Sequence, residues 1–285
     1  MKNILVPTDF SPKSFSALML AKQISEKSNG TRHLLHVVEP ISGHFTSSGE
    51  YAKDDFEAVY ARSVIESAGR ELKALSKAHE NGSLRIDWQV VVGDPYSEVA
   101  EKVQEVAADL VIIGAKGITD SDDFFLGSLT DKIVRNAPCP VITVKAVIDD
   151  TSVFRNIVYA TDLQEEHRSV ISLLSTLQNY DQTTIHIVRV NTPKNFRNDI
   201  DVQVELEKLA DRYELENYTL NTYSHEDEEY GIVYFADEVN ADLIVMGIHE
   251  KSGFRRLISG GSLVNEVTDH TFRPVLTSRF DSRSK

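Results

Sequence analysis

The stretch ADLVIIGAKG at residues 108–117 returns later in the chain as ADLIVMGIHE at residues 241–250. Two further segments return in the same order. NILVPTDFS at residues 3–11 matches NIVYATDLQ at residues 156–164, and PVITV at residues 140–144 matches PVLTS at residues 274–278. Ordered matches of this kind indicate two homologous domains. We place them at residues 1–147 and 153–280, on either side of a short acidic segment.

Each repeat alternates short apolar runs with longer segments of helical periodicity. In the first repeat the runs of strand length are NILVPT, TRHLLHVVE, LRIDWQVVVG, DLVIIGA and PVITVK. The third run alternates at Ile86, Trp88 and Val90. Ser11 is a candidate N-cap, with Pro12 at the first helical position. This pattern predicts an α/β fold in which helices cover both faces of a parallel sheet.

The bulk composition excludes several classes of partner. A net charge of −14 over 285 residues disfavours nucleic-acid backbones and anionic membranes, so we expect neither as a partner. The amino-terminal segment reaches Pro7 and Asp9 too soon for a signal peptide, and we expect a cytoplasmic protein. The single cysteine, Cys139, is expected to be a buried or lining thiol rather than a nucleophile.

Glycines follow the fourth apolar run of the first repeat with the spacing Gly114-x2-Gly117-x9-Gly127-Ser128. Gly114 and Gly117 are expected to permit close backbone approach and positive φ. Gly127 and Ser128 are expected to begin a helix whose amide groups favour an anion. Ligands of such sheets bind at the carboxyl ends of the strands where strand order reverses. The glycine loop and Asp9 are therefore expected to share one crevice.

Taken together, these segments resemble the universal stress protein family in its tandem two-domain form. The glycine spacing is that of the nucleotide-binding loop in the family's ATP-binding members, and VPTDFS, LLHVVE and CPVITV also look like the family. The resemblance implies two Rossmann-like domains of the adenine nucleotide alpha hydrolase type. Each would be a five-stranded parallel sheet with strand order 3-2-1-4-5.

The resemblance also implies that an adenine nucleotide, ATP, is bound in the first domain, and it leaves open whether Mg²⁺ accompanies it. Asp9 would lie beside the adenosine and Val37 would contact the adenine through its backbone. The glycine loop would surround ribose and phosphates. The implied cofactor-binding set is Pro7, Thr8, Asp9, Val37, Gly114, Lys116, Gly117, Gly127, Ser128 and Leu129.

The second repeat departs from this pattern. Gly247 and His249 match the first repeat, but Glu250 replaces the second glycine. We therefore expect the second domain to bind a triphosphate poorly or not at all. Arg255 and Arg256 keep an anion site open there.

The loop of the first repeat is acidic, with Asp120, Asp122 and Asp123 at its centre. Three interpretations stay open. The acids help to hold a divalent cation carried by ATP, or they repel phosphate so that the pocket takes another ligand, or they face water in a solvated loop. Asp9 likewise has an alternative role as a helix cap, and His36 and His249 are expected to be structural.

The sequence thus predicts a nucleotide-binding regulatory protein of the stress response. The alternative is a dimerising scaffold or a sensor of another small ligand. An enzyme is not expected, because no general base is identifiable and a His-x-Gly-His signature is absent. Family precedent implies that the fifth strands of the two domains pair within the chain, and two chains can then form a homodimer. The sequence names no protein partner.

Overall fold

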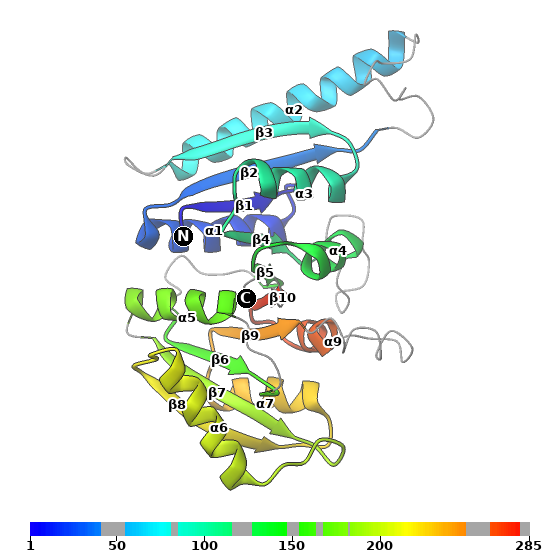
Figure 1. Ribbon diagram of the computed structural model, residues 1–285. Coiled ribbons are helices and arrows are strands. Elements are labelled where there is room, and N and C mark those ends of the chain that lie inside the picture. The colour runs from blue at the N-terminus through cyan, green and yellow to red at the C-terminus, as the bar shows by residue number, and fades with distance from the viewer. Residues whose placement is uncertain are drawn as a thin grey trace.

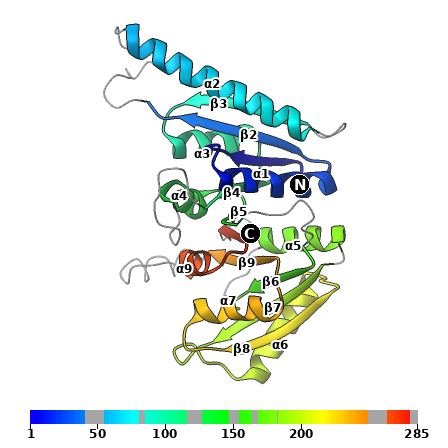
Figure 2. The ribbon, with the colours of Figure 1, turned by 180° about the vertical axis from the view of Figure 1, so that it is seen from behind.

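One sheet runs through the whole molecule (Figure 1 and Figure 2). The computed structural model describes residues 1–40, 55–80, 85–115, 127–146, 154–163, 168–181, 183–248 and 263–279. Within them the ten-stranded sheet has the order β3-β2-β1-β4-β5-β10-β9-β6-β7-β8. Each half is parallel and has the order 3-2-1-4-5, so the predicted fold class is confirmed.

The two halves have matching elements. The first half consists of β1 Asn3–Pro7, α1 Pro12–Ser28, β2 Thr31–Val38, α2 Asp55–His79, β3 Ile86–Val92, α3 Pro95–Glu105, β4 Leu110–Gly114, α4 Ser128–Asn136 and β5 Val141–Val144. The second half consists of β6 Asn156–Ala160, α5 Arg168–Asp181, β7 Thr184–Asn191, α6 Asp199–Arg212, β8 Tyr218–Ser224, α7 Glu228–Glu238, β9 Leu243–Ile248, α9 Leu263–His270 and β10 Val275–Arg279.

Helix α1 begins where the sequence predicts. The Ser11 side chain accepts a hydrogen bond from the Ser14 amide at 3.2 Å, and Pro12 occupies the first helical turn. At the other end Asn29 adopts the left-handed conformation with φ 52°, which closes the helix. The position of α1 is therefore fixed locally at both ends.

Two apolar cores cover the two faces of the sheet, and each continues through both halves. One core contains the buried residues of α1, α2, α5 and α6, and the other contains those of α3, α4, α7 and α9. Along β1, Ile4 and Val6 belong to the first core and Leu5 to the second. At the sheet edge the burial is incomplete, because β3 has only one neighbouring strand. Trp88 keeps 40% exposure there.

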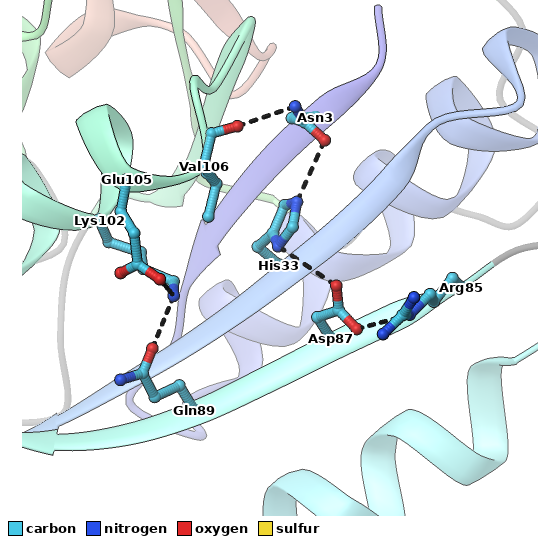
Figure 3. A network of polar contacts seen from close by, with 8 residues as sticks. All are labelled: Asn3, His33, Arg85, Asp87, Gln89, Lys102, Glu105 and Val106. Carbon is cyan, nitrogen blue, oxygen red and sulfur yellow. Dashed lines mark hydrogen bonds and ion pairs between the residues drawn. The ribbon is translucent and has the colours of Figure 1, made fainter.

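A polar network ties together the first three strands and α3 (Figure 3). His33 on β2 contacts Asn3 Oδ1 on β1 at 3.3 Å and Asp87 on β3 at 3.8 Å. Burial lowers the pKa of His33, and the Asp87 carboxylate acts in the opposite direction. The second half repeats the pair, with His186 lying 3.3 Å from Asn156 Oδ1. The repeat therefore extends to partly buried polar contacts.

The halves join at an antiparallel seam between β5 and β10. Thr143 pairs with Val275, Ile142 with Leu276, and Val141 with Thr277. In the aligned repeats Leu276 is the equivalent of Ile142, and the two flanking pairs exchange under the repeat symmetry, so a pseudo-twofold axis passes through the Ile142–Leu276 pair. The side chain of Thr143 donates to Val275 O at 3.3 Å, and that of Thr277 donates to Val141 O at 3.4 Å. The same contact is thus made twice about the axis.

Beside the seam the side chains depart from this symmetry, because equivalent positions of the two halves carry different charges. Asn265 on α9 donates to Asp131 Oδ1 on α4 at 2.8 Å, although the two positions are equivalent in the aligned repeats. Asp131 also accepts from Arg135 at 2.8 Å. Across the seam Lys145 lies 3.8 Å from Asp269. A symmetric pair of first halves would instead bring two Asp131 carboxylates together.

We predict that Asn265→Asp lowers the free energy of unfolding by about 1 kcal/mol more than Asn265→Ala does, because two carboxylates then face each other. Urea unfolding at low ionic strength measures the difference, and salt should reduce it by screening. Asn265→Ala is the control, since it removes the hydrogen bond without adding charge. Equal stabilities of the two variants would contradict this account of the seam.

Candidate functional site

A crevice opens at the carboxyl ends of β1 and β4, which are neighbours in the sheet. Their following helices α1 and α4 lie in different cores, so the strand order reverses at this point. The crevice has a volume of about 530 Å³. Eight of the ten residues predicted from the sequence line it: Pro7, Thr8, Asp9, Val37, Gly114, Gly127, Ser128 and Leu129.

The other two predicted residues, Lys116 and Gly117, lie outside the described residues, as do the three loop aspartates. The same holds for His249, Glu250, Arg255 and Arg256 of the second half. The described part of the chain nevertheless brings together the ends of β1, β2 and β4 and the beginning of α4. Segments more than a hundred residues apart in sequence therefore share one crevice, as expected.

The turn after β1 holds Asp9 at the crevice. The Phe10 amide donates to Thr8 Oγ1 at 3.1 Å, and the Ser11 amide donates to Asp9 Oδ1 at 3.0 Å. Because the N-cap of α1 is Ser11, the alternative in which Asp9 caps this helix is wrong. Phe10 has a left-handed backbone with φ 64°.

The second half makes the same turn. Leu163 has φ 63°, and its amide donates to Thr161 Oγ1 at 3.1 Å. A left-handed residue with a side chain costs roughly 1–2 kcal/mol. Since both halves contain it, this conformation belongs to the fold and is not specific to a ligand of the first half.

Gly114 requires a correction. The sequence predicts positive φ and close approach of a ligand, but Gly114 does not have a left-handed backbone. A Cβ at this position would lie 3.0 Å from Lys13 C and 3.0 Å from Ser14 N. The glycine is therefore needed because the backbone of α1 begins directly against the end of β4.

Gly127 begins α4 without a left-handed conformation either, with φ −62° and ψ 149°. Its amide donates to Ala115 O at 2.8 Å, so the glycine loop starts and ends at one point of the sheet. No side chain caps the helix at Gly127. The amide groups of the first turn, at Ser128 and Leu129, therefore lie at the crevice without a side-chain acceptor from the cap residue.

Three charged lining residues were not predicted: Glu39, Asp94 and Lys132. Lys132 stands one helical turn after Ser128, a spacing visible in the sequence. Asp94 caps α3, and hydrogen bonds from the Ser97 side chain and amide lower its pKa. With Asp9, the described lining thus carries more carboxylates than cations.

His36 and Cys139 have structural surroundings. His36 Nδ1 donates a hydrogen bond to Thr8 O at 2.8 Å. The imidazole ring packs against the Phe10 ring with the two ring centroids 4.6 Å apart. This is the structural role expected for His36. Burial raises the pKa of the Cys139 thiol to about 12, and Asp109 adds to the effect. The thiol is therefore protonated at neutral pH and is a poor nucleophile, as expected.

Comparison with known proteins agrees with this geometry. The model of the universal stress protein family matches residues 1–145 and again residues 154–279. The chain belongs to the universal stress protein family. The two matches also confirm the tandem form that the repeats indicate.

Relatives from archaea illustrate the similarity. Universal stress protein MJ0531 of Methanocaldococcus jannaschii is 30% identical over 152 residues, covering 50% of this chain and 82% of the relative. MJ0577 of the same organism is 27% identical over 153 residues, covering 50% and 94%. The crystal structure of a universal stress protein from Archaeoglobus fulgidus covers 98% of this chain and 97% of its own, with TM-score 0.77 and 19% identity. That last similarity concerns the fold alone.

The equivalent strand end in the second universal stress protein domain makes different contacts among the described residues. Arg189 replaces His36 at the end of β7 and is 5% exposed. Its guanidinium donates to the Asn191 side chain and to Asn195 O. Burial lowers the pKa of Arg189, and the nearby Arg197 adds to the effect. The segment after β7 is thereby held against the strand end.

Helix α7 closes on the same strand end. Gly231 stands four residues after the cap Asp227, where α3 has Glu98 after its cap Asp94. A Cβ at Gly231 would lie 2.6 Å from Val190 Cγ1. Val190 is the equivalent of Val37, so α7 rests directly on the position that borders the crevice in the first half.

No helix among the described residues is long and apolar enough to cross a membrane.

We predict that Gly114→Ala lowers the free energy of unfolding by about 1–3 kcal/mol, because the new methyl group overlaps the backbone of α1. Gly69→Ala is the matched control. Its Cβ would meet only Trp88 at 4.0 Å, within a helix, so this variant should gain about 0.5–1 kcal/mol. Urea unfolding measures both. A Gly114→Ala protein as stable as the parent would contradict the packing role of this glycine.

Proposed function

We propose that the chain is a regulatory protein of the stress response that binds one adenine nucleotide, ATP, in the crevice of its first half. One observation carries the proposal. Residues nominated from the sequence lie in four separate segments, and the eight described ones line a single crevice of about 530 Å³. This volume lies in the range of small-molecule sites, about 300–1,000 Å³.

The charges around the crevice favour a nucleotide whose phosphates lie toward α4. The amide groups at the beginning of α4 and the ammonium group of Lys132 attract an anion there. The carboxylates of Asp9 and Glu39 line the crevice near the ends of β1 and β2. These carboxylates do not form a metal-binding cluster within the described residues. We therefore propose that any Mg²⁺ enters with the phosphates.

The contacts of the second half support the binding of one nucleotide per chain. Arg189 and its partners occupy the end of β7, and α7 rests on Val190. These contacts are a physical reason for weak binding that does not depend on Glu250. Domain two then acts as a structural partner, joined to the first through the common sheet.

We further propose binding without turnover, in the cytoplasm. His36 donates through Nδ1 to a backbone carbonyl and packs on Phe10, which are contacts of a structural residue. The alternative function, a scaffold or a sensor of another ligand, is favoured by the carboxylates of the described lining. The nucleotide and scaffold proposals differ in whether ATP stabilises the chain.

The test is thermal unfolding with and without ATP and Mg²⁺, using the parent, Ser128→Glu and Gln104→Glu. ATP at a hundredfold excess over its dissociation constant should raise the parent midpoint by roughly 5 °C or more. Ser128→Glu should keep the fold, since an acid suits a helix N-terminus, but should weaken ATP binding roughly tenfold or more.

Gln104→Glu is the control, because it adds the same charge to an exposed position of α3 outside the crevice. Gly117→Glu, which copies Glu250 into the first half, should behave like Ser128→Glu. No stabilisation of the parent by ATP, or equal stabilisation of all variants, would contradict the proposed site and leave the scaffold function.

A further inference from the structure

A second concave site lies between α1 and α2, and described residues alone account for its lining. The groove has a volume of about 410 Å³. It is lined by residues of the β1 end, α1, β2 and α2, most of them apolar: Thr8, Phe10, Ser14, Phe15, Leu18, Leu34, Glu71, Ala74, Leu75 and Ala78. Its volume lies at the lower end of the range for small-molecule sites.

The groove exists because α2 presents small side chains toward α1. Ala68, Leu72 and Ser76 recur every four residues and are buried, so this stripe packs on the sheet side. The adjoining stripe contains Ala74 and Ala78, whose methyl groups do not fill the space to α1. Phe15 of α1 reaches across to His79 with ring centroids 5.6 Å apart, and it stays 43% exposed.

The polar groups inside the groove are already paired. Thr8 Oγ1 donates to Ser14 Oγ at 3.0 Å, and Ser14 Oγ donates to Ser11 O at 2.9 Å. Thr8 Oγ1 also accepts the Phe10 amide. These hydroxyls offer little to a polar ligand, so the groove favours hydrocarbon.

Charge distinguishes among apolar ligands. Glu71 is the charged residue of the lining, on an exposed position of α2. The chain as a whole carries −14. A carboxylate or sulfate head group would meet repulsion from both, whereas an ammonium head group would meet an opposite charge.

We propose that the groove between α1 and α2 binds a small cationic amphiphile, with its hydrocarbon part among Leu18, Leu34 and Leu75 and its ammonium group at Glu71. The groove is distinct from the nucleotide crevice but shares a wall with it, since Thr8 and Ser14 line both. Phe10 and His36 stack across the same wall, one lining each site. The inference does not depend on nucleotide binding.

The test uses the neutral fluorescent probe N-phenyl-1-naphthylamine on the full chain, with displacement by dodecylamine or dodecanoate below their micellar concentrations. The parent should bind the probe, and dodecylamine should displace it at lower concentration than dodecanoate. Ala78→Trp fills the groove and should weaken probe binding roughly tenfold. Lys77→Trp is the control, because it adds the same side chain to an exposed neighbouring position outside the groove.

Glu71→Gln isolates the charge. It should weaken dodecylamine binding about threefold, as for an exposed ion pair, and leave the neutral probe unchanged. Circular dichroism checks that each variant is folded. The proposal is overturned if the parent does not bind the probe, if Ala78→Trp binds it as tightly as Lys77→Trp, or if dodecanoate displaces it as well as dodecylamine does.

Discussion

The antiparallel pairing of β5 with β10 is the contact on which the rest of the architecture depends. It turns two five-stranded sheets into one and lets each apolar core continue from one half into the other. It also brings α4 and α9 side by side, as the Asn265–Asp131 hydrogen bond and Figure 1 show. The helix that begins at the crevice is therefore braced by the second half.

The seam also limits how chains associate. β5 uses one edge for β4 and the other for β10, and β10 is likewise paired on both edges with β9 and β5. The polar contacts beside it join unlike residues, Asp131 with Asn265 and Lys145 with Asp269. These contacts suit the pairing of the two halves within one chain. The homodimer expected from the sequence stays a prediction, and it would have to use another surface.

Much of the fold could be predicted because the repeats and the alternation of apolar runs are local signals. The strand order came with the family resemblance, and the crevice followed from the rule on strand ends. The positive φ expected at Gly114 is wrong, and its packing against α1 was not foreseen, because a glycine spacing does not say whether a neighbouring helix needs the room. The contact of α7 with Val190 was also missed, because the sequence alone does not show that a strand side chain packs against Gly231. Arg189 in the place of His36 was the available sequence signal for an altered second half.

The most direct test of the central claim is hydrogen exchange of the full chain with and without ATP and Mg²⁺. Binding in the first half alone predicts slower exchange for the amides of residues 8, 9, 35–37 and 127–130, which line the crevice. The equivalent amides at the ends of β6 and β7, at residues 161, 162 and 188–190, should not change. Equal protection of both halves, or none in either, would contradict the assignment of a single nucleotide site to the first half.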